Sequence, residues 1–403
     1  MNLYHKIIGF LGLKKSMVAL LSMVILVGLG EKMAERFLPI YLLALGGGIL
    51  SIGFLNGLDN LLSALYSFPG GYLSDRLGHK KALLVFNLIA MFGYVIVIIF
   101  PYWQAVFIGS VFFLSWTAIS LPATMSLVSK SLPQNKRTMG VSLHSLVRRI
   151  PMALGPIIGG LMIGLYGEKN GVRMSFVIAL ILGGVSLILQ QLMIEEEDRQ
   201  CRAEKNPLTL WGEMPVLLKK LLVSDILVRF AEQIPYAFVV VWCIKNNGIS
   251  ALEFGLLTTI EMATAMLVYI PIAYLADKSS KKPFVVITFF NFAVFPLVLL
   301  FSRSFTMMII AFIVRGLKEF GEPTRKALIM DLAPEDKKAC MFGMYYLVRD
   351  IIVSLAAVGG AFLWQISPET NLLTATCFGF LGMAFFWIFG KDSSSQIKNT
   401  EPK

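Results

Sequence analysis

Long apolar stretches follow one another along the chain, and short polar segments separate them. Each stretch is close to or above the ~20 residues that a helix needs to cross the hydrocarbon core of a bilayer. Backbone groups in lipid must satisfy their hydrogen bonds within the segment, so these stretches predict helices. We expect twelve spans, at residues 17–44, 50–73, 82–100, 103–129, 138–166, 174–194, 219–244, 253–276, 284–301, 305–332, 339–364 and 372–390.

The composition supports the membrane interpretation. Apolar residues make up 56% of the 403 residues and charged residues only 15%, whereas soluble domains carry about 25% charged residues. A soluble enzyme is therefore excluded. The formal charge of +11 lies mostly in the short segments between the apolar stretches. The lipid bilayer explains that placement better than a nucleic-acid partner does.

The basic residues are distributed unevenly between the two sides of the expected bundle. Twenty-two Lys and Arg residues fall on the side that holds both chain ends, and four fall on the other side: Lys169, Arg173, Lys245 and Arg303. Cytoplasmic loops carry an excess of Lys and Arg. We therefore predict a multi-pass protein of the plasma membrane, the inner membrane in a bacterium, with both termini in the cytoplasm.

The two halves of the chain resemble each other at an offset of about 201 residues. ILVGLGE at 25–31 matches ILVRFAE at 226–232, and GYLSDRLGHKK at 71–81 matches AYLADKSSKKP at 273–283. An even number of spans per half makes the repeats parallel, which is typical of secondary transporters with a site between the halves. The predicted domains are an N-terminal six-helix bundle (1–194), a cytoplasmic linker (195–218) and a C-terminal six-helix bundle with a short tail (219–403).

The segment after the second span carries a motif, GYLSDRLGHKK, that resembles the loop signature of the major facilitator superfamily. His79 replaces the usual first basic residue, and the second copy has Ala273 and Ser280 where glycines are expected. The resemblance implies a gating role for Gly71, Asp75, Arg76, Gly78, Lys80, Asp277 and Lys278. The alternative is a charged turn that only fixes the topology.

The fifth span contains Gly155, Pro156, Gly159 and Gly160, in an order similar to the core of the motif of proton-driven exporters. Ser142 and Pro151 stand where that motif has glycines, and no charge lies in the fourth span, where the family has a basic residue. Glycines also let helices approach closely, so simple helix packing is an equal alternative.

Ionisable residues within the spans are costly and face protein or water, so they are the candidate site. Those we expect on the substrate or proton pathway are Glu31, Glu35, Arg148, Arg149, Glu232, Lys318, Glu322, Arg349 and Asp350. The resemblance implies that their spans line the central cavity. Arg148 lies about ten residues into its span, or about 15 Å, near the middle of the bilayer.

Three interpretations compete for these charges. Arg148 and Arg349 could bind an anionic substrate, because guanidinium groups offer fixed donor forks. Glu31 or Glu232 could carry a proton, because burial disfavours the charged form of a carboxyl group. The charges could instead pair with one another and be structural, as in Lys318–Glu322 at i,i+4 or in an Arg149–Asp350 bridge between the halves.

We therefore predict an all-α membrane protein of twelve helices in two pseudo-symmetric bundles, resembling a major facilitator transporter. The expected function is proton-coupled efflux of a small amphipathic compound by alternating access. The alternatives are proton-coupled or facilitated uptake of an organic anion, and a transport-inactive sensor or assembly partner on the same scaffold. No ATP-binding loop, protease motif or clustered His or Cys ligands occur in the sequence, so we expect no enzyme activity, cofactor or metal. We also expect the protein to be a monomer.

Overall fold

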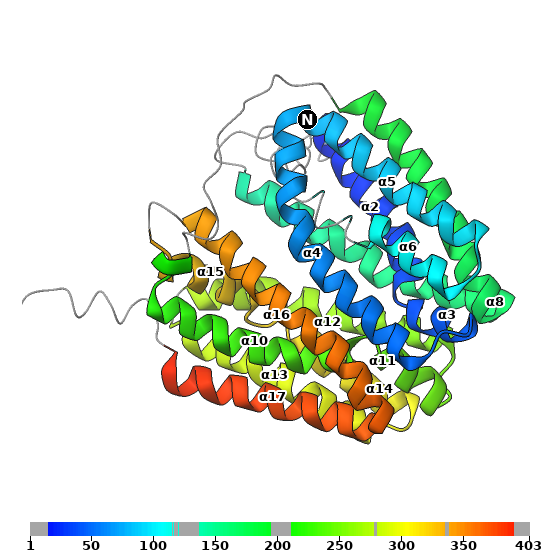
Figure 1. Ribbon diagram of the computed structural model, residues 1–403. Coiled ribbons are helices and arrows are strands. Elements are labelled where there is room, and N and C mark those ends of the chain that lie inside the picture. Colours follow the sequence, from blue (N-terminus) through cyan, green and yellow to red (C-terminus); the bar gives the residue numbers. More distant parts are fainter. Residues whose placement is uncertain are drawn as a thin grey trace, which may run out of the picture. The chain divides into compact units, whose positions relative to one another are not determined.

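A computed structural model of the chain describes residues 15–114, 116, 120, 137–194, 211–277, 280–334 and 338–390. The regular secondary structure of these residues is helical throughout (Figure 1). The helices are α2 (Lys15–Glu35), α3 (Leu38–Ala44), α4 (Ile49–Leu77), α5 (His79–Ile99), α6 (Trp103–Phe113), α8 (Arg137–Met193), α10 (Val216–Tyr236), α11 (Val239–Val241), the π-helix η2 (Trp242–Asn246), α12 (Ala251–Asp277), α13 (Lys282–Phe301), α14 (Phe305–Leu317), α15 (Glu322–Leu332), α16 (Lys338–Ile366) and α17 (Pro368–Phe389).

Eight helices in the described ranges are long and apolar enough to cross a membrane on their own. One of them, α8, covers both the fifth and the sixth expected spans, and its two limbs are separated at Gly167. The φ of Gly167 is 77°, in the left-handed region that glycine adopts most readily. The first and tenth expected spans are each divided into two shorter helices, α2 with α3 and α14 with α15.

The helix bounds reproduce the repeat of the sequence. The offset that pairs ILVGLGE with ILVRFAE also pairs Lys15 with Val216 and Glu35 with Tyr236, which are the two ends of α2 and of α10. The interruption after Glu35 therefore recurs after Tyr236. The same offset pairs the first residue of α3 with that of α11, and the first residue of α8 with that of α16. Both halves thus build the same helices from sequences that have diverged.

The chain forms two compact units. Unit 1 comprises Met1–Gly48, Leu62–Ala203 and Ser250–Thr259, and unit 2 comprises Ile49–Leu61, Glu204–Ile249 and Ile260–Lys403. The first part of α4 thus belongs to unit 2 and the first part of α12 to unit 1. The domain bounds expected from the sequence remain a prediction, and each unit is described by itself below.

In unit 1, α2 packs closely on both limbs of α8. A Cβ at Gly159 would collide with the carbonyl oxygen of Met33, and one at Gly30 would collide with the backbone of Ala179. Helices in lipid associate through such close approaches at small residues, because lipid tails are as apolar as leucine. The missing side chains therefore set the distance between these helices.

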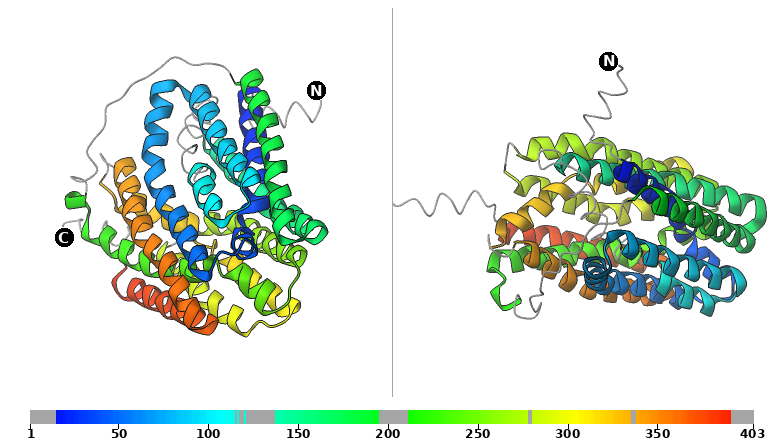
Figure 2. Two further views of the ribbon diagram at one scale, coloured as in Figure 1. Left: turned by 45° about the vertical axis from the view of Figure 1, so that its right-hand side comes forward. Right: turned by 90° about the horizontal axis from the view of Figure 1, so that it is seen from above.

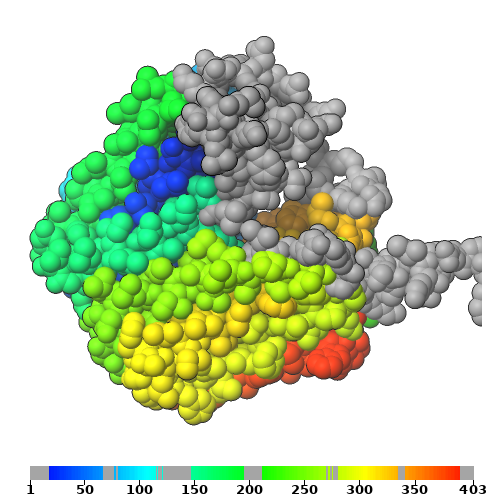
Figure 3. Space-filling model, turned by 180° about the vertical axis from the view of Figure 1, so that it is seen from behind, coloured from blue at the N-terminus to red at the C-terminus, as the bar shows by residue number. Residues whose placement is uncertain are grey.

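In unit 2, α10 lies against α16 and α17, and α13 packs against both α17 and α10 (Figure 2). A Cβ at Gly360 would collide with the carbonyl oxygen of Ile234, and the sequence repeat pairs this contact with that of Gly159 and Met33. Seen from behind, α13 and α14 form one continuous surface (Figure 3). Phe290, Phe301 and Ile310 are exposed on these two helices, as expected for side chains that contact lipid.

Candidate functional site

Two helical segments of unit 2 present a stripe of charge to each other. On α10 the stripe is Asp225, Arg229 and Glu232, at spacings of four and three residues that place them on one helix face. On α14 and α15 the facing stripe is Arg315, Lys318, Glu322 and Arg325. Both stripes contain charges of both signs, so opposite charges can meet across the gap.

Three ion pairs join the two stripes, and we call them the ion-pair ladder. Arg325 forms an ion pair with Asp225, Arg229 Nη2 lies 3.3 Å from Glu322 Oε2, and Lys318 Nζ lies 2.8 Å from Glu232 Oε1. Arg229 also donates to Glu232 at 2.6 Å, and Arg325 donates to Glu322. Neighbouring pairs are therefore linked into one continuous network.

Glu261 of α12 extends the ladder at the Lys318 end. Its side chain is 1% exposed and lies 3.3 Å from Arg315 Nε and 3.5 Å from Lys318 Nζ. The guanidinium of Arg315 also stacks on the rings of Tyr236, Phe295 and Phe312. Aromatic rings stabilise a cation that has lost contact with water.

The other end of the ladder is closed by α16. Arg349 lies 3.5 Å from Asp225 and 2.7 Å from Asp350, and the hydroxyl of Tyr345 donates to Asp225 at 3.0 Å. Asp225 therefore holds Arg325 and Arg349 together. A buried charge is tolerated only when it is paired in this way.

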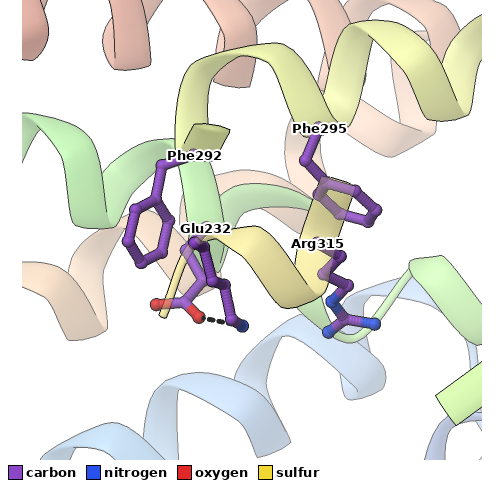
Figure 4. A pocket seen from close by; sticks show the side chains of 5 residues that line it. Glu232, Phe292, Phe295 and Arg315 are labelled. Atoms are coloured by element: carbon purple, nitrogen blue, oxygen red, sulfur yellow. Dashed lines mark hydrogen bonds and ion pairs between the residues drawn. The ribbon is translucent and has the colours of Figure 1, made fainter. Parts of the chain in front are cut away.

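A small cavity opens on the ladder within unit 2. Its lining residues are Glu232, Phe292, Phe295, Arg315 and Lys318. Figure 4 shows Glu232 beside Phe292 and Arg315 beside Phe295 around the cavity. The space holds about one water molecule. It combines one carboxylate with two cations and two apolar rings.

The tenth expected span is interrupted beside this cavity. α14 ends at Leu317 and α15 begins at Glu322, with Pro323 in its first turn. The backbone N–H of Gly321 donates to the hydroxyl of Thr288 on α13. Interrupted helices at membrane depth occur where the backbone is buried in protein or lines a cavity, and in transporters they form binding sites.

Unit 1 has a smaller charged group on α2. Glu31 is 4% exposed, and its Oε1 accepts from Lys32 at 3.1 Å. Lys32 also pairs with Glu35. The second oxygen of Glu31, Oε2, is buried without a hydrogen-bond partner among the described residues. A buried polar atom of this kind requires an explanation, such as a proton or a ligand.

The structure brings together five residues of the expected pathway, and all five lie in the network of unit 2: Glu232, Lys318, Glu322, Arg349 and Asp350. Glu31 and Glu35 share Lys32 in unit 1, and Arg148 and Arg149 lie partly buried on α8. Asp350 pairs with Arg349, its neighbour in the sequence. The bridge from Arg149 to Asp350 and a single site shared by both halves remain predictions.

The motif after the second span lies mostly on helices. Gly71, Asp75 and Arg76 belong to α4. The side chains of Asp75, Arg76 and Asp277 lie outside the described part, and so does Lys278 as a whole. Gly78 caps α5 with a φ of 82°. Lys80 Nζ donates to the carbonyl oxygen of Gln191 at 2.9 Å, within unit 1. The gating role therefore remains a prediction.

The three glycines of the exporter-like segment, Gly155, Gly159 and Gly160, meet neighbouring backbone. Gly155 faces Lys32 and Met33, and Gly160 faces Ala251 at the start of α12. The carbonyl oxygen of Pro156 lies against Gly255 of the same segment. These contacts are what the packing interpretation expects, and they leave an export-specific role to be tested.

Five central members of the network were not among the expected site residues: Asp225, Arg229, Glu261, Arg315 and Arg325. A signal for Asp225 was available, because it precedes Arg229 by four residues on an apolar helix. No group of three or more potential metal ligands occurs within the described ranges.

Comparison with known proteins places these observations in a family context. A family model described as the Major Facilitator Superfamily matches residues 20–225 and 221–403. An uncharacterized MFS-type transporter of Methanocaldococcus jannaschii, MJ1317, is 25% identical over 361 residues, covering 86% of this chain and 87% of that protein. The uncharacterized MFS-type transporter YfkF of Bacillus subtilis is 28% identical over 153 residues, covering 38% of each chain.

Solved structures give the same picture at the level of fold. The nucleoside transporter NupG has a TM-score of 0.78 at 14% identity, over 93% of this chain and 100% of that chain. A peptide transporter, POT, in complex with sulfate has a TM-score of 0.75 at 14% identity, over 93% of each chain. A bacterial homolog of the human lysosomal transporter Spinster, inward-facing and occupied, has a TM-score of 0.74 at 14% identity, over 93% of this chain and 96% of that chain. At these identities the likeness establishes the fold and leaves the substrate open.

Proposed function

The chain belongs to the Major Facilitator Superfamily and is a multi-pass secondary transporter rather than an enzyme, and on that premise we propose that it exchanges protons for a small amphipathic compound. Transport proceeds by alternating access, in which the two six-helix halves rock about a central site. The protein works as a monomer in the plasma membrane with both termini in the cytoplasm. The twenty-two basic residues on the side of the chain ends support this orientation.

One observation carries the proposal: Glu232 is a partly buried carboxylate, 11% exposed, that lines the cavity together with Phe292 and Phe295. The phenyl rings suit the apolar part of an amphipathic compound. A cationic group of the compound takes the place of Lys318 at Glu232, and the neighbouring aromatic rings favour that cation. The preferred cargo is therefore a small amphipathic cation.

Competition for Glu232 supplies the coupling. In the structure its two oxygens are held by Lys318 and Arg229. A proton neutralises the carboxylate and removes its attraction for a cationic compound, and a bound compound disfavours the proton for the same reason. The two occupants exclude each other, and in this proposal the halves rearrange only when the site is occupied, so the release of one occupant must be followed on the same side by uptake of the other. This exclusion is the basis of antiport.

Glu31 is the second candidate proton carrier. It occupies the equivalent position in the repeat, since Glu31 and Glu232 end the matching segments. Its unpartnered Oε2 could accept a proton without breaking an existing hydrogen bond. Substitution of each glutamate by glutamine separates the two roles.

The direction of transport rests on a weaker argument. The Gly155–Gly160 segment is similar to the motif of exporters, and its glycines are also explained by packing. Export is the direction we propose. Uptake of an organic anion is less well supported, because Arg349, one of its two expected ligands, is engaged by Asp225 and Asp350.

The test uses purified protein in proteoliposomes, with ethidium as a cationic amphipathic probe and an imposed pH gradient. We expect gradient-driven ethidium movement in the parent protein and its loss, by tenfold or more, in Glu232→Gln. Glu369→Gln, which alters an exposed carboxylate of α17, is the matched control and should transport normally. If both Glu232→Gln and Glu31→Gln retain full gradient-driven movement, the proton-carrier proposal is wrong. Movement of organic anions in place of ethidium would support the alternative substrate class.

A further inference from the structure

Lys318 lies between carboxylates of two different helices. Its Nζ is 2.8 Å from Glu232 of α10 and 3.5 Å from Glu261 of α12. The lysine side chain is 11% exposed and the Glu261 side chain is 1% exposed. Water therefore competes little for the ion pair between them. A short movement of the ammonium group would exchange the closer carboxylate for the other.

The backbone around Lys318 favours such a movement. Lys318 is the residue directly after α14, where the helix ends, and the next helix starts at Glu322. The lysine is therefore joined to the end of α14 and not to α15, where Glu322 and Arg325 are held by Arg229 and Asp225. The ammonium group of lysine is a compact point charge on a flexible stem, so it can pair with either carboxylate without the fixed fork geometry that arginine requires.

Each carboxylate keeps a cation when Lys318 leaves it. Glu232 retains Arg229 at 2.6 Å, and Glu261 retains Arg315 at 3.3 Å. Neither position of the lysine therefore leaves a buried carboxylate without a positive partner, which would be strongly destabilising. Two arrangements of similar energy are what a switch requires.

We propose that Lys318 is a two-position switch, which moves its ion pair from Glu232 to Glu261 when Glu232 takes up a proton or a cationic compound. Glu261 is then a positioning residue of the transport cycle, because it holds the lysine away from the cavity. The displacing event rests on the function proposed above, whereas the two positions of Lys318 rest on the geometry of unit 2 alone.

Other groups face the two carboxylates and are part of the balance. Glu232 faces Arg229 on its own helix and the rings of Phe292 and Phe295 on α13. Glu261 faces Arg315 on α14. Lys318 also interacts electrostatically with Glu319 and Arg315. The substitutions below leave Arg229, Arg315, Glu319 and the two rings in place.

The closing experiment is a double-mutant cycle on the purified protein, without a gradient or a substrate. The melting temperatures of the parent, Glu232→Gln, Glu261→Gln and the double variant are followed by tryptophan fluorescence. A lysine that can use either carboxylate compensates for the loss of one, so the double variant should melt lower than the sum of the single effects by about 2 °C or more. The same cycle in the Lys318→Met background should be additive.

An additive cycle in the parent background would overturn the switch. A cycle that is equally non-additive in the Lys318→Met background would do the same, because the coupling would then not involve the lysine.

If the double variant fails to fold, Glu261→Asp and Glu261→Gln are compared by the pH dependence of ethidium movement. We expect Glu261→Gln to need a lower pH for half-maximal movement, because its lysine stays on Glu232 and competes with the proton. Glu261→Asp should restore the parent profile, and unchanged profiles in both variants would contradict the switch.

The outcomes for the switch and for the proposed function are separable. A non-additive cycle together with no gradient-driven ethidium movement in the parent would retain the switch and reject proton antiport. An additive cycle together with gradient-driven movement that depends on Glu232 would do the reverse.

Discussion

Arg325 of α15 and Asp225 of α10 form an ion pair in which each side chain is 1% exposed. Asp225 also accepts from the hydroxyl of Tyr345. Removing one partner of a buried pair leaves an uncompensated charge, at a cost of about 3–5 kcal/mol. We therefore expect Asp225→Asn to lower the melting temperature of the purified protein strongly, or to prevent its accumulation in the membrane.

The matched control is Lys326→Gln. Lys326 is 46% exposed and lies 3.6 Å from Glu322, and exposed pairs contribute about 0–1 kcal/mol. Its substitution should shift the melting temperature little. Equal stability losses in Asp225→Asn and Lys326→Gln would show that the Asp225 end of the ion-pair ladder does not stabilise the fold.

Gly159 is a second position where a single substitution should lower the stability of the protein. An alanine Cβ there would collide with the carbonyl oxygen of Met33 on α2. Overpacking of this kind costs about 1–3 kcal/mol when the backbone must shift. We expect Gly159→Ala to lower the melting temperature, and Gly360→Ala to act similarly through Ile234.

Gly164, on the same limb of α8, provides the comparison. A Cβ at Gly164 would meet no atom within 4 Å. Alanine also favours a helix over glycine by about 0.5–1 kcal/mol. Gly164→Ala should therefore leave the melting temperature unchanged or slightly higher. A fall as large as that of Gly159→Ala would attribute both effects to a cause other than the contact with Met33.

Much of this fold could be predicted from the sequence, because in lipid the chain has few alternatives to a helix. The repeat was visible in ILVGLGE and ILVRFAE, and it recurs in the bounds of α2 and α10. The hydrophobic pattern did not reveal the interruption at residues 318–321, where the N–H of Gly321 donates a tertiary hydrogen bond to Thr288. Apolar periodicity carries no information about such a partner.

The site was predictable only in part, for a similar reason. Buried charge marked Glu232, Lys318 and Arg349 as candidates, since charge within a span requires a partner. The choice of partner depends on which helices are neighbours, and this cannot be read from one span at a time. Asp225 and Glu261 each complete an ion pair with another helix, so their roles became visible only in three dimensions.

The orientation can be tested directly with single cysteines. In a variant lacking the four native cysteines, we place one cysteine at Lys169 and, separately, one at Ser280, both of which are exposed. The excess of basic residues assigns Lys169 to the outer side and Ser280 to the cytoplasm. An impermeant maleimide added to intact cells should label the cysteine at position 169, and should label that at 280 only after permeabilisation. The opposite pattern would reverse the topology.

The interruption of the tenth span should depend on Thr288. Its hydroxyl accepts from the N–H of Gly321, and Thr288→Val would leave that N–H buried without a partner, at a cost of about 1–3 kcal/mol. Thr376 is the matched control, because its hydroxyl donates to Leu372 within α17, and Thr376→Val should cost far less. We expect Thr288→Val to lower the melting temperature and to weaken the non-additivity between Glu232 and Glu261, since Lys318 lies at that interruption. Equal melting of the two variants would mean that the interruption is held by Pro323 and Gly321 alone.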